Sequence, residues 1–228
     1  LLTDVLLRDD STYKQVFQEG TLEFTGRKGG RVLAMKEFTI RATTTVTELI
    51  DFMDEALGIQ STAADPANPV PVSLEGTSTE PPRGKVENGR IVLTGNNGVD
   101  NAVDIGPAGK RLRTATGTEN IDMSWGVTQA AIGESAVTDF LVYDSAGTPI
   151  RVRITAVLEA RDATSTTYRW FADSPDNDPA RGAEIAVGTG RITFDGEGNL
   201  IAVSESTVSI QRQDLSAASG LEFELDFS

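Results

Sequence analysis

Two short stretches of the chain contain residues that could bind ions. Residues 26–31, GRKGGR, combine glycines with cations, as loops that hold phosphate groups do. The stretch lacks the Gly-Lys-Ser/Thr ending and no helix is expected directly after it, so a tight turn on a surface hairpin is the preferred interpretation. Residues 173–179, DSPDNDP, cluster aspartates that could suggest calcium. Their spacing does not match the helical calcium loop, which favours a solvated acidic loop.

The chain has no histidine and no cysteine. A disulfide and a thiolate or imidazole metal site are therefore excluded, and so is the usual Ser-His-Asp triad. Carboxylates are plentiful, so a glycoside hydrolase with two catalytic carboxylates stays open, but no pair of them stands out. We expect no catalytic residue, no metal and no cofactor.

Aromatic residues and one glycine-rich turn complete the candidates for chemistry. Trp125, Tyr168, Trp170 and Phe171 could form a platform for a sugar, although packing across a pleated sheet is the preferred role. Residues 195–199, DGEGN, contain oxygen ligands, but the two glycines are typical of a turn. None of these residues identifies a reaction.

The charge of the chain limits its partners. The 228 residues carry 34 Asp and Glu against 20 Lys and Arg, a net charge of −14. Such a surface repels phosphate backbones and anionic lipids, so we expect neither nucleic acid nor a membrane surface as partner. No apolar run is long enough to span a bilayer, and residues 1–10 do not have the pattern of a secretory signal peptide.

One helix is predicted, over residues 44–60. Thr45 or Thr47 can serve as its N-cap, and Gly58 is a natural end. Apolar residues follow at helical spacing between these ends: Leu49, Ile50, Phe52, Met53, Ala56 and Leu57. After the helix, residues 61–84 contain five prolines and are expected to form an exposed loop.

The remaining pattern before residue 120 favours strands and turns. Residues 21–31 look like a strand that enters a turn at Gly29 and Gly30, and residues 37–45 alternate as a strand does. Residues 85–105 predict strands that are separated by Asn-Gly turns. Residues 106–120 are expected to be irregular.

From Ala136 onward the pattern is that of β-strands. Hairpins are predicted around residues 144–147 and 195–199, residues 166–173 form an aromatic strand, and residues 221–227 form a final strand. The fold class is thus mostly β with one clear helix. Two domains are expected: an α+β domain at residues 1–130 and a small antiparallel barrel or sandwich at residues 131–228, with the boundary between 106 and 133.

A series of motifs between residues 137 and 206 resembles the central domain of the bacterial flagellar hook protein. A strand leads into a YDSxG turn, here Tyr143, Asp144 and Gly147, and a later strand contains Trp170. A Gly-x-hydrophobic-x-Phe-Asp-x-x-Gly-x-Leu hairpin follows, and its residues are Gly190, Ile192, Phe194, Asp195, Gly198 and Leu200. The order of the helix and then GRIVLTG at residues 89–95 is similar to longer hook proteins and other flagellar axial proteins.

The resemblance implies a structural role and not an enzyme. Hook subunits form a curved, extracellular tube that transmits motor torque to the filament, and they are exported without a cleaved signal peptide. The implied partners are other copies of the chain and neighbouring axial proteins. The helices that build the inner tube in that family are missing here, so we expect a monomeric fragment with only the outer domains. Residues 106–133 would then act as a hinge between these domains.

Some alternatives remain open at this stage. An extracellular carbohydrate- or calcium-binding adhesin module would share the acidic, cysteine-free and β-rich character, and the distal rod protein and the hook cap share motifs with the hook. Residues 63–84 and 173–181 are the expected subunit contacts, because long loops that project from a β-scaffold often bind partners. These loops could equally be mobile without binding anything.

Overall fold

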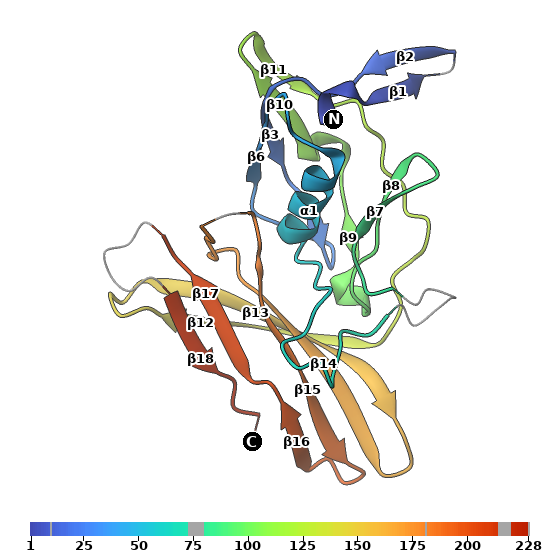
Figure 1. The fold of residues 1–228 in the computed structure, drawn as a ribbon. Helices are drawn as coiled ribbons and strands as arrows, with labels where there is room; N and C mark the ends of the chain where they lie inside the picture. Colours follow the sequence, from blue (N-terminus) through green and yellow to red (C-terminus); the bar gives the residue numbers. More distant parts are fainter. Residues whose placement is uncertain (10, 73–79, 181, 214–219, 228) are drawn as a thin grey trace.

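The computed structural model describes residues 1–9, 11–72, 80–180, 182–213 and 220–227, and it consists mainly of antiparallel strands (Figure 1). The expectation of a mostly β fold with one α-helix is confirmed for these residues. The elements up to residue 120 are η1 (Leu2–Asp4), β1 (Leu6–Asp9), β2 (Thr12–Gln15), β3 (Gly20–Phe24), β4 (Arg27–Lys28), β5 (Arg31–Val32), β6 (Lys36–Ile40), α1 (Val46–Leu57), β7 (Gly84–Glu87), β8 (Arg90–Leu93), η2 (Val99–Asn101), β9 (Val103–Asp104), η3 (Pro107–Gly109), β10 (Lys110–Thr114) and β11 (Gly117–Asn120).

Helix α1 forms as its sequence predicts. Thr45 is the N-cap and forms a capping box with Glu48, in which each side chain bonds the backbone N–H of the other residue. Gly58 ends the helix in the left-handed conformation, with φ of 63°. All six apolar residues predicted to share one face of the helix are buried. Burial of one such side chain contributes about 1.5–3 kcal/mol, so this face fixes the helix on its sheet.

The helix packs on a four-stranded antiparallel sheet of order β11-β10-β3-β6. Leu22 and Phe24 of β3 and Leu112 of β10 belong to one hydrophobic core with the helix. The ring of Phe52 lies edge-on to Phe24, with centroids 5.7 Å apart. This sheet and its helix form the centre of what we call the first part of the chain, residues 1–120.

The expectation that residues 106–120 are irregular is wrong. They contain the short η3 turn and strands β10 and β11, and β10 lies between β3 and β11. The pattern in β10, KRLRT, has only Leu112 as an apolar residue, so hydrophobic periodicity gives little signal there. Arg111 and Arg113 face Glu23 of β3, whose oxygens lie 3.7 and 4.0 Å from their guanidinium nitrogens, so charge pairing takes the place of alternating apolar residues.

Smaller sheets surround this core. The β4–β5 hairpin turns at Gly29 and Gly30, as expected, and β4 also pairs with β9. Strands β1 and β2 form a hairpin at the N-terminal end, and β7 and β8 form another through the predicted Asn88-Gly89 turn. Strand β6 ends at Ile40, so the strand expected at residues 37–45 is shorter than its Thr-rich sequence suggested.

What we call the second part, residues 135–227, is built on a five-stranded antiparallel meander. Its strands follow one another in the order β12-β13-β14-β15-β16. They are β12 (Ser135–Tyr143), β13 (Pro149–Arg161), β14 (Ser165–Asp173), β15 (Ala186–Asp195) and β16 (Leu200–Ser204), and a separate ribbon contains β17 (Thr207–Gln211) and β18 (Gly220–Glu224). Both predicted hairpins and the aromatic strand are present, and the final strand is shorter than expected.

The ribbon β17–β18 covers one face of the meander. Val208 and Ile210 of β17 are fully buried with Trp170 and Ile150 in a second hydrophobic core. Phe223 of β18 lies edge-on to Phe140 of β12, with centroids 6.2 Å apart. The second part is therefore a two-layer antiparallel sandwich.

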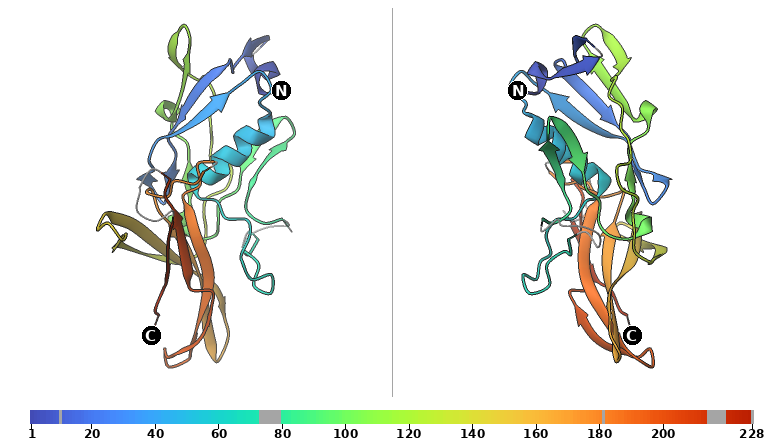
Figure 2. Two further views of the ribbon diagram at one scale, coloured as in Figure 1. Left: turned by 60° about the vertical axis from the view of Figure 1, so that its left-hand side comes forward. Right: turned by 90° about the vertical axis from the view of Figure 1, so that its right-hand side faces the viewer.

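The two parts lie end to end, with the N-terminus at one end of the molecule and the C-terminus at the other (Figure 2). Residues 121–134 connect them without forming a helix or strand. The division into domains at residues 130 and 131 stays a prediction. Within the described ranges, no helix is long and apolar enough to cross a membrane.

Candidate functional site: the junction between the two parts

The two stretches that could bind ions, residues 26–31 and 173–179, meet at the junction between the two parts, where a lysine of one forms an ion pair with an aspartate of the other. Lys28 of β4 donates a hydrogen bond from Nζ to Oδ1 of Asp173 at 3.0 Å and lies 2.8 Å from Oδ2 of the same carboxylate. The two side chains are 4% and 2% exposed. The interpretation of residues 26–31 as a surface turn is thus wrong for Lys28, and that of residues 173–179 as a solvated loop is wrong for Asp173.

The C-terminal end of α1 completes this cluster. Nζ of Lys28 also donates to the carbonyl oxygen of Gly58 at 2.8 Å, so the ammonium closes the helix end as well. A Cβ at Gly58 would lie 2.6 Å from Oδ1 of Asp173. Glycine is therefore required there both for its left-handed backbone and for space.

The loop after Asp173 is folded against the junction. Ser174 is fully buried, and its hydroxyl donates to the carbonyl of Arg151 at 2.8 Å. Asn177 is buried too and bridges two elements: its Nδ2 donates to the Glu184 carbonyl and its Oδ1 accepts from the Gln211 amide. Ser174 and Asn177 therefore do not project from the scaffold, whereas Asp178 and Ala180 are exposed. A subunit contact at residues 173–181 stays a prediction, and Arg181 lies outside the described residues.

Helix α1 is anchored from two further sides. Oε2 of Glu55 accepts a hydrogen bond from the Ala183 amide at 2.8 Å, and the Glu55 carbonyl accepts from the Ile185 amide at 3.1 Å. On the other side, Gln60 and Asn96 exchange a reciprocal pair of hydrogen bonds of 2.9 and 2.7 Å. The end of the helix is thus fixed to both parts of the chain by buried polar contacts.

The proline-rich loop is held by a buried arginine. Arg169 of β14 is 1% exposed and donates to Glu159 at 2.7 Å and to the carbonyls of Asn68 and Pro69 at 3.1 and 2.9 Å. Val70 is buried against Val157 and Phe171. The expectation of an exposed loop is therefore wrong for Val70, which is buried, and holds for Pro69, which is exposed. Residues 73–79 of that loop lie outside the described residues.

One carboxyl at the junction of α1 and β7 has an unusual protonation equilibrium. Oδ2 of Asp54 accepts a hydrogen bond from the Gly84 amide at 2.7 Å, while its Oδ1 is buried without a partner. Burial raises the pKa of Asp54 to about 6, against a smaller lowering by the Gly84 bond. This group is therefore expected to gain a proton in mildly acidic solution.

The motif residues of the hook resemblance lie away from this junction. Asp144 and Asp195 open two hairpin turns of the same design, in which Oδ1 accepts the amides two and four residues later at 2.8–2.9 Å. Gly147 and Gly198 adopt φ of 79° and 89° in these turns, and the hydrogen bonds keep the pKa of both aspartates below the usual value. Tyr143 is 61% exposed at the end of β12.

The other motif residues pack the sandwich core. Trp170 is fully buried, and a Cβ at Gly190 would lie 2.8 Å from its Nε1 and 2.4 Å from two backbone carbonyls. Gly190 therefore makes room for the indole where β15 approaches the end of β16 and the residue after it. Phe194 lies edge-on to Tyr168 at 6.3 Å, and Leu200 borders the same core. The role of these residues as a family motif stays a prediction.

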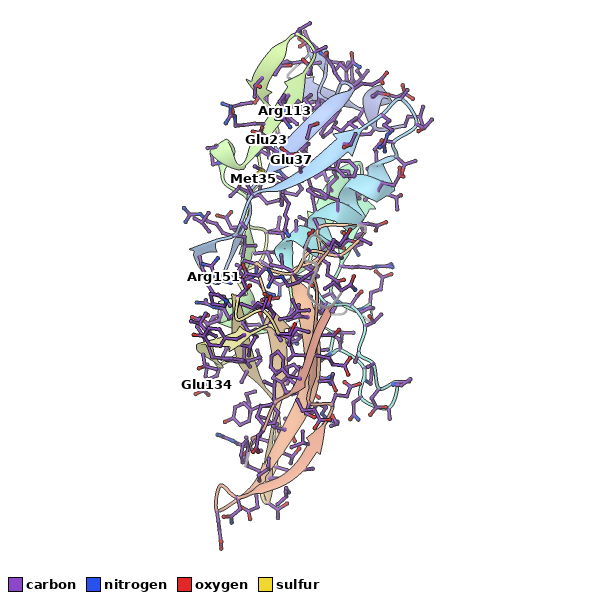
Figure 3. The ribbon with its side chains drawn as sticks, turned by 90° about the vertical axis from the view of Figure 1, so that its left-hand side faces the viewer. Glu23, Met35, Glu37, Arg113, Glu134 and Arg151 are labelled. Atoms are coloured by element: carbon purple, nitrogen blue, oxygen red, sulfur yellow. The ribbon has the colours of Figure 1, made fainter. Side chains whose placement is uncertain are left out.

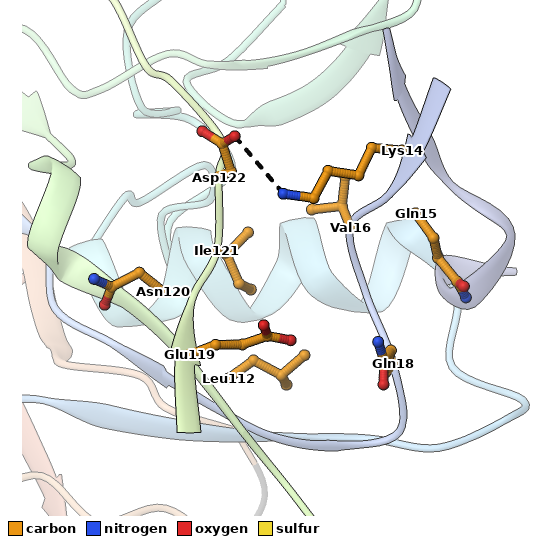
Figure 4. Close-up of a pocket in the computed structure, with 9 residues that line it drawn as sticks. All are labelled: Lys14, Gln15, Val16, Gln18, Leu112, Glu119, Asn120, Ile121 and Asp122. Atoms are coloured by element: carbon orange, nitrogen blue, oxygen red, sulfur yellow. Dashed lines mark ion pairs between the residues drawn. The ribbon is translucent and has the colours of Figure 1, made fainter. Parts of the chain in front are cut away.

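The aromatic platform predicted for a sugar does not form, although a cavity of about 350 Å³ lies between residues 92–97, 101–105 and 125–132. Trp170 and Phe171 are buried, so they form no sugar platform, and Trp125 is half-buried against the first core. No group of three or more metal-ligating side chains occurs in the described part of the chain. The cavity in Figure 4, about 40 Å³ and bordered by Lys14 and Asp122, is too small for a substrate.

Sequence reasoning missed the Lys28–Asp173 pair and the Arg169 network. Lys28 and Asp173 are 145 residues apart, so no local pattern connects them. Arg169 lies inside the strand TTYRWFAD, where a cation between two aromatic residues was the available signal. A charged residue whose sequence neighbours in a strand are apolar indicates a buried ion pair.

One comparison with known proteins gave a match. The family model described as "Flagellar basal body protein FlaE D2 domain" matches residues 127–228, which contain the whole five-stranded sheet and the β17–β18 ribbon. This region includes the motifs that resemble the hook protein. No curated protein and no solved structure matches the chain.

Proposed function

We propose that the chain is the outer part of a flagellar hook subunit, on the premise that residues 127–228 match the family model of the flagellar basal body protein FlaE D2 domain. The domain belongs to a structural family and not to an enzyme family. The observation that supports the hook over other axial proteins is the size of the structure carried beside the D2 domain: a second sheet with its own core and helix.

The mechanism follows from how the two parts are joined. A subunit that transmits torque must not bend inside its outer region, or the load would be lost in internal deformation. Here a buried ion pair, a helix end and two folded loops connect the parts. Opening the junction would leave buried charges without their partners. Because an unpaired buried charge strongly destabilises the folded state, the junction resists opening.

The structure does not favour the hinge predicted at residues 106–133. Residues 110–120 are strands of the first sheet, and the connection is reduced to residues 121–134. Gly98 and Val99 of the first part donate backbone hydrogen bonds to Ile132 and Gly133 at 2.8 and 3.2 Å. We therefore place the flexibility that a curved tube needs between subunits and not inside this chain.

The partners and the location follow from the same proposal. The partners are other copies of the chain and neighbouring flagellar axial proteins, and the place is the extracellular hook. The adhesin alternative loses its main support, because the aromatic residues it needs are in the core and Asp173 is already paired with Lys28.

Immunogold electron microscopy of motile source cells, with antibodies raised against this chain, tests the proposal. We expect gold on the short curved segment at the base of each filament. Gold over the general cell surface with unlabelled flagella would exclude the hook and restore the adhesin. Gold confined to the rod inside the envelope would identify a rod protein instead.

A further inference from the structure

A cavity of about 350 Å³ lies between the first part of the chain and the connection to the second part. Its apolar lining includes Leu57 at the end of α1, Leu93 of β8 and Ile105. Residues 125–132 border it from the connection, and residues 126–130 are exposed, so the cavity is open to solvent on that side. Its volume lies at the lower end of the range for small-molecule sites.

Two polar atoms of residues that line this cavity are buried without a hydrogen-bond partner. They are Nε1 of Trp125, which can only donate, and Oδ1 of Asn101, which can only accept. Asn101 is fully buried, and its Nδ2 already donates to the carbonyl of Asn97 at 2.8 Å. Leaving a buried polar group unpaired is unfavourable, so each atom calls for a partner that is not among the described residues.

Further hydrogen-bonding groups lie along the same lining. Thr94, Thr128 and Gln129 border the cavity, and no side-chain hydrogen bond joins any of them to another described residue. Hydroxyl and amide groups both donate and accept hydrogen bonds. The lining therefore offers several uncharged donors and acceptors beside an apolar surface.

The charge around the cavity selects against ionic ligands. Among the described residues that border it, Asp104 is the only charged one, and the whole chain carries a net charge of −14. Both repel an anion such as a phosphate or a carboxylate. A cation would meet a single carboxylate that is exposed to water, and such a contact contributes little. A neutral ligand that is rich in hydroxyl groups fits this lining best.

We propose that this cavity binds a neutral saccharide of one or two rings. Sugar hydroxyls donate and accept at once, as Nε1 of Trp125 and Oδ1 of Asn101 require, and the C–H faces of a sugar ring pack on indole and aliphatic side chains. The site is separate from Trp170 and Phe171, which are buried in the second part. It is also independent of the proposed function, because it depends only on the residues around the cavity.

The two tryptophans of the chain make a direct test possible. An isotope-labelled sample gives one indole N–H signal for each in nuclear magnetic resonance, and Trp125→Phe assigns them. Maltose, cellobiose and N,N′-diacetylchitobiose are titrated separately. We expect at least one of these sugars to shift the Trp125 signal in a saturable way and to leave the signal of Trp170, fully buried in the sandwich core, unchanged. No saturable shift with any of them would mean that only water enters the cavity and would overturn the proposal.

A double variant tests whether the sugar contacts this lining. Thr128→Val/Gln129→Ala removes polar groups of two exposed residues, so the fold should be retained. We expect its dissociation constant for the sugar to rise about two- to tenfold, as for the loss of one hydrogen bond. Tyr143→Phe is the control, because it removes a hydroxyl from a side chain that is 61% exposed and does not border the cavity. Equal affinities of the double variant and this control, or an equal response to the anionic sugar glucuronic acid, would overturn the proposal.

Discussion

At the scale of single residues, the Lys28–Asp173 pair decides whether the two parts stay together. Lys28→Met leaves the Asp173 carboxylate buried without its cation, and loss of one partner of a buried pair costs about 3–5 kcal/mol. We expect the free energy of unfolding in urea to fall by that amount. In the double variant Lys28→Met/Asp173→Leu, no charge is left unpaired, so its stability should exceed that of Lys28→Met.

A matched control comes from the surface of the first sheet. Arg113 pairs with Glu37 at 2.9 Å, but both side chains are 50% exposed and lie together on one side of the molecule (Figure 3). Arg113→Met should change the free energy of unfolding by less than about 1 kcal/mol. Equal losses for Lys28→Met and Arg113→Met would show that the buried pair has no special role.

Gly190 tests the packing of the sandwich core. Gly190→Ala places a Cβ against two backbone carbonyls and the Trp170 indole, and overpacking of this kind costs about 1–3 kcal/mol. We expect a lower urea midpoint and a change in tryptophan fluorescence. Gly196→Ala is the control, since its Cβ would meet only the Thr164 carbonyl at 3.9 Å. Unchanged stability of Gly190→Ala would show that Gly190 is not closely packed against the Trp170 indole.

At the scale of elements, the contact between α1 and β7 should make stability depend on pH. The pKa of Asp54 rises from 3.8 to about 6 on folding, so the folded state binds the proton more tightly. The stabilisation from this protonated group is complete below pH 3.8 and is lost as the pH rises through about 6. Because Asp54 is partly exposed, we expect the effect to be only about 1 kcal/mol.

Asp54→Asn removes this titration and isolates its contribution. The free energy of unfolding of the variant, relative to the unaltered chain, should increase between pH 4.5 and 7 by about 1 kcal/mol. Asp51→Asn, a neighbour on the exposed side of α1, should show no such increase. A difference that stays constant with pH would mean that Asp54 is not protonated on folding.

The elements that follow from local rules were predictable, and the rest were not. Helix α1 and the turns at Asp144 and Asp195 depend on caps, glycines and side chains within a few residues, which the sequence shows directly. Strand β10 has little apolar alternation and exists because β3 and β11 flank it. The burial of Lys28, Arg169 and Asp173 depends on partners from distant segments. The local sequence shows only that these residues are charged, which favours exposed side chains.

In the molecule as a whole, both parts are expected to move as one body. The buried contacts at the junction come from four segments: β4, the end of α1, residues 68–70 and the loop after β14. The two parts are therefore joined at several places. In the proposed hook subunit, a rigid outer region would pass load to the next subunit, whereas a hinged one would absorb it. This rigidity concerns motion within one copy of the chain.

The rigidity of the junction can be measured by electron spin resonance, as the distance between two spin labels. The labels are placed at Thr118→Cys on β11 and Glu197→Cys in the β15–β16 turn, which are both exposed and lie in different parts of the chain. We expect a single narrow distance distribution that becomes broad when Lys28→Met is added. A distribution that is already broad or split without that substitution would contradict a rigid junction and would restore the hinge between the two parts.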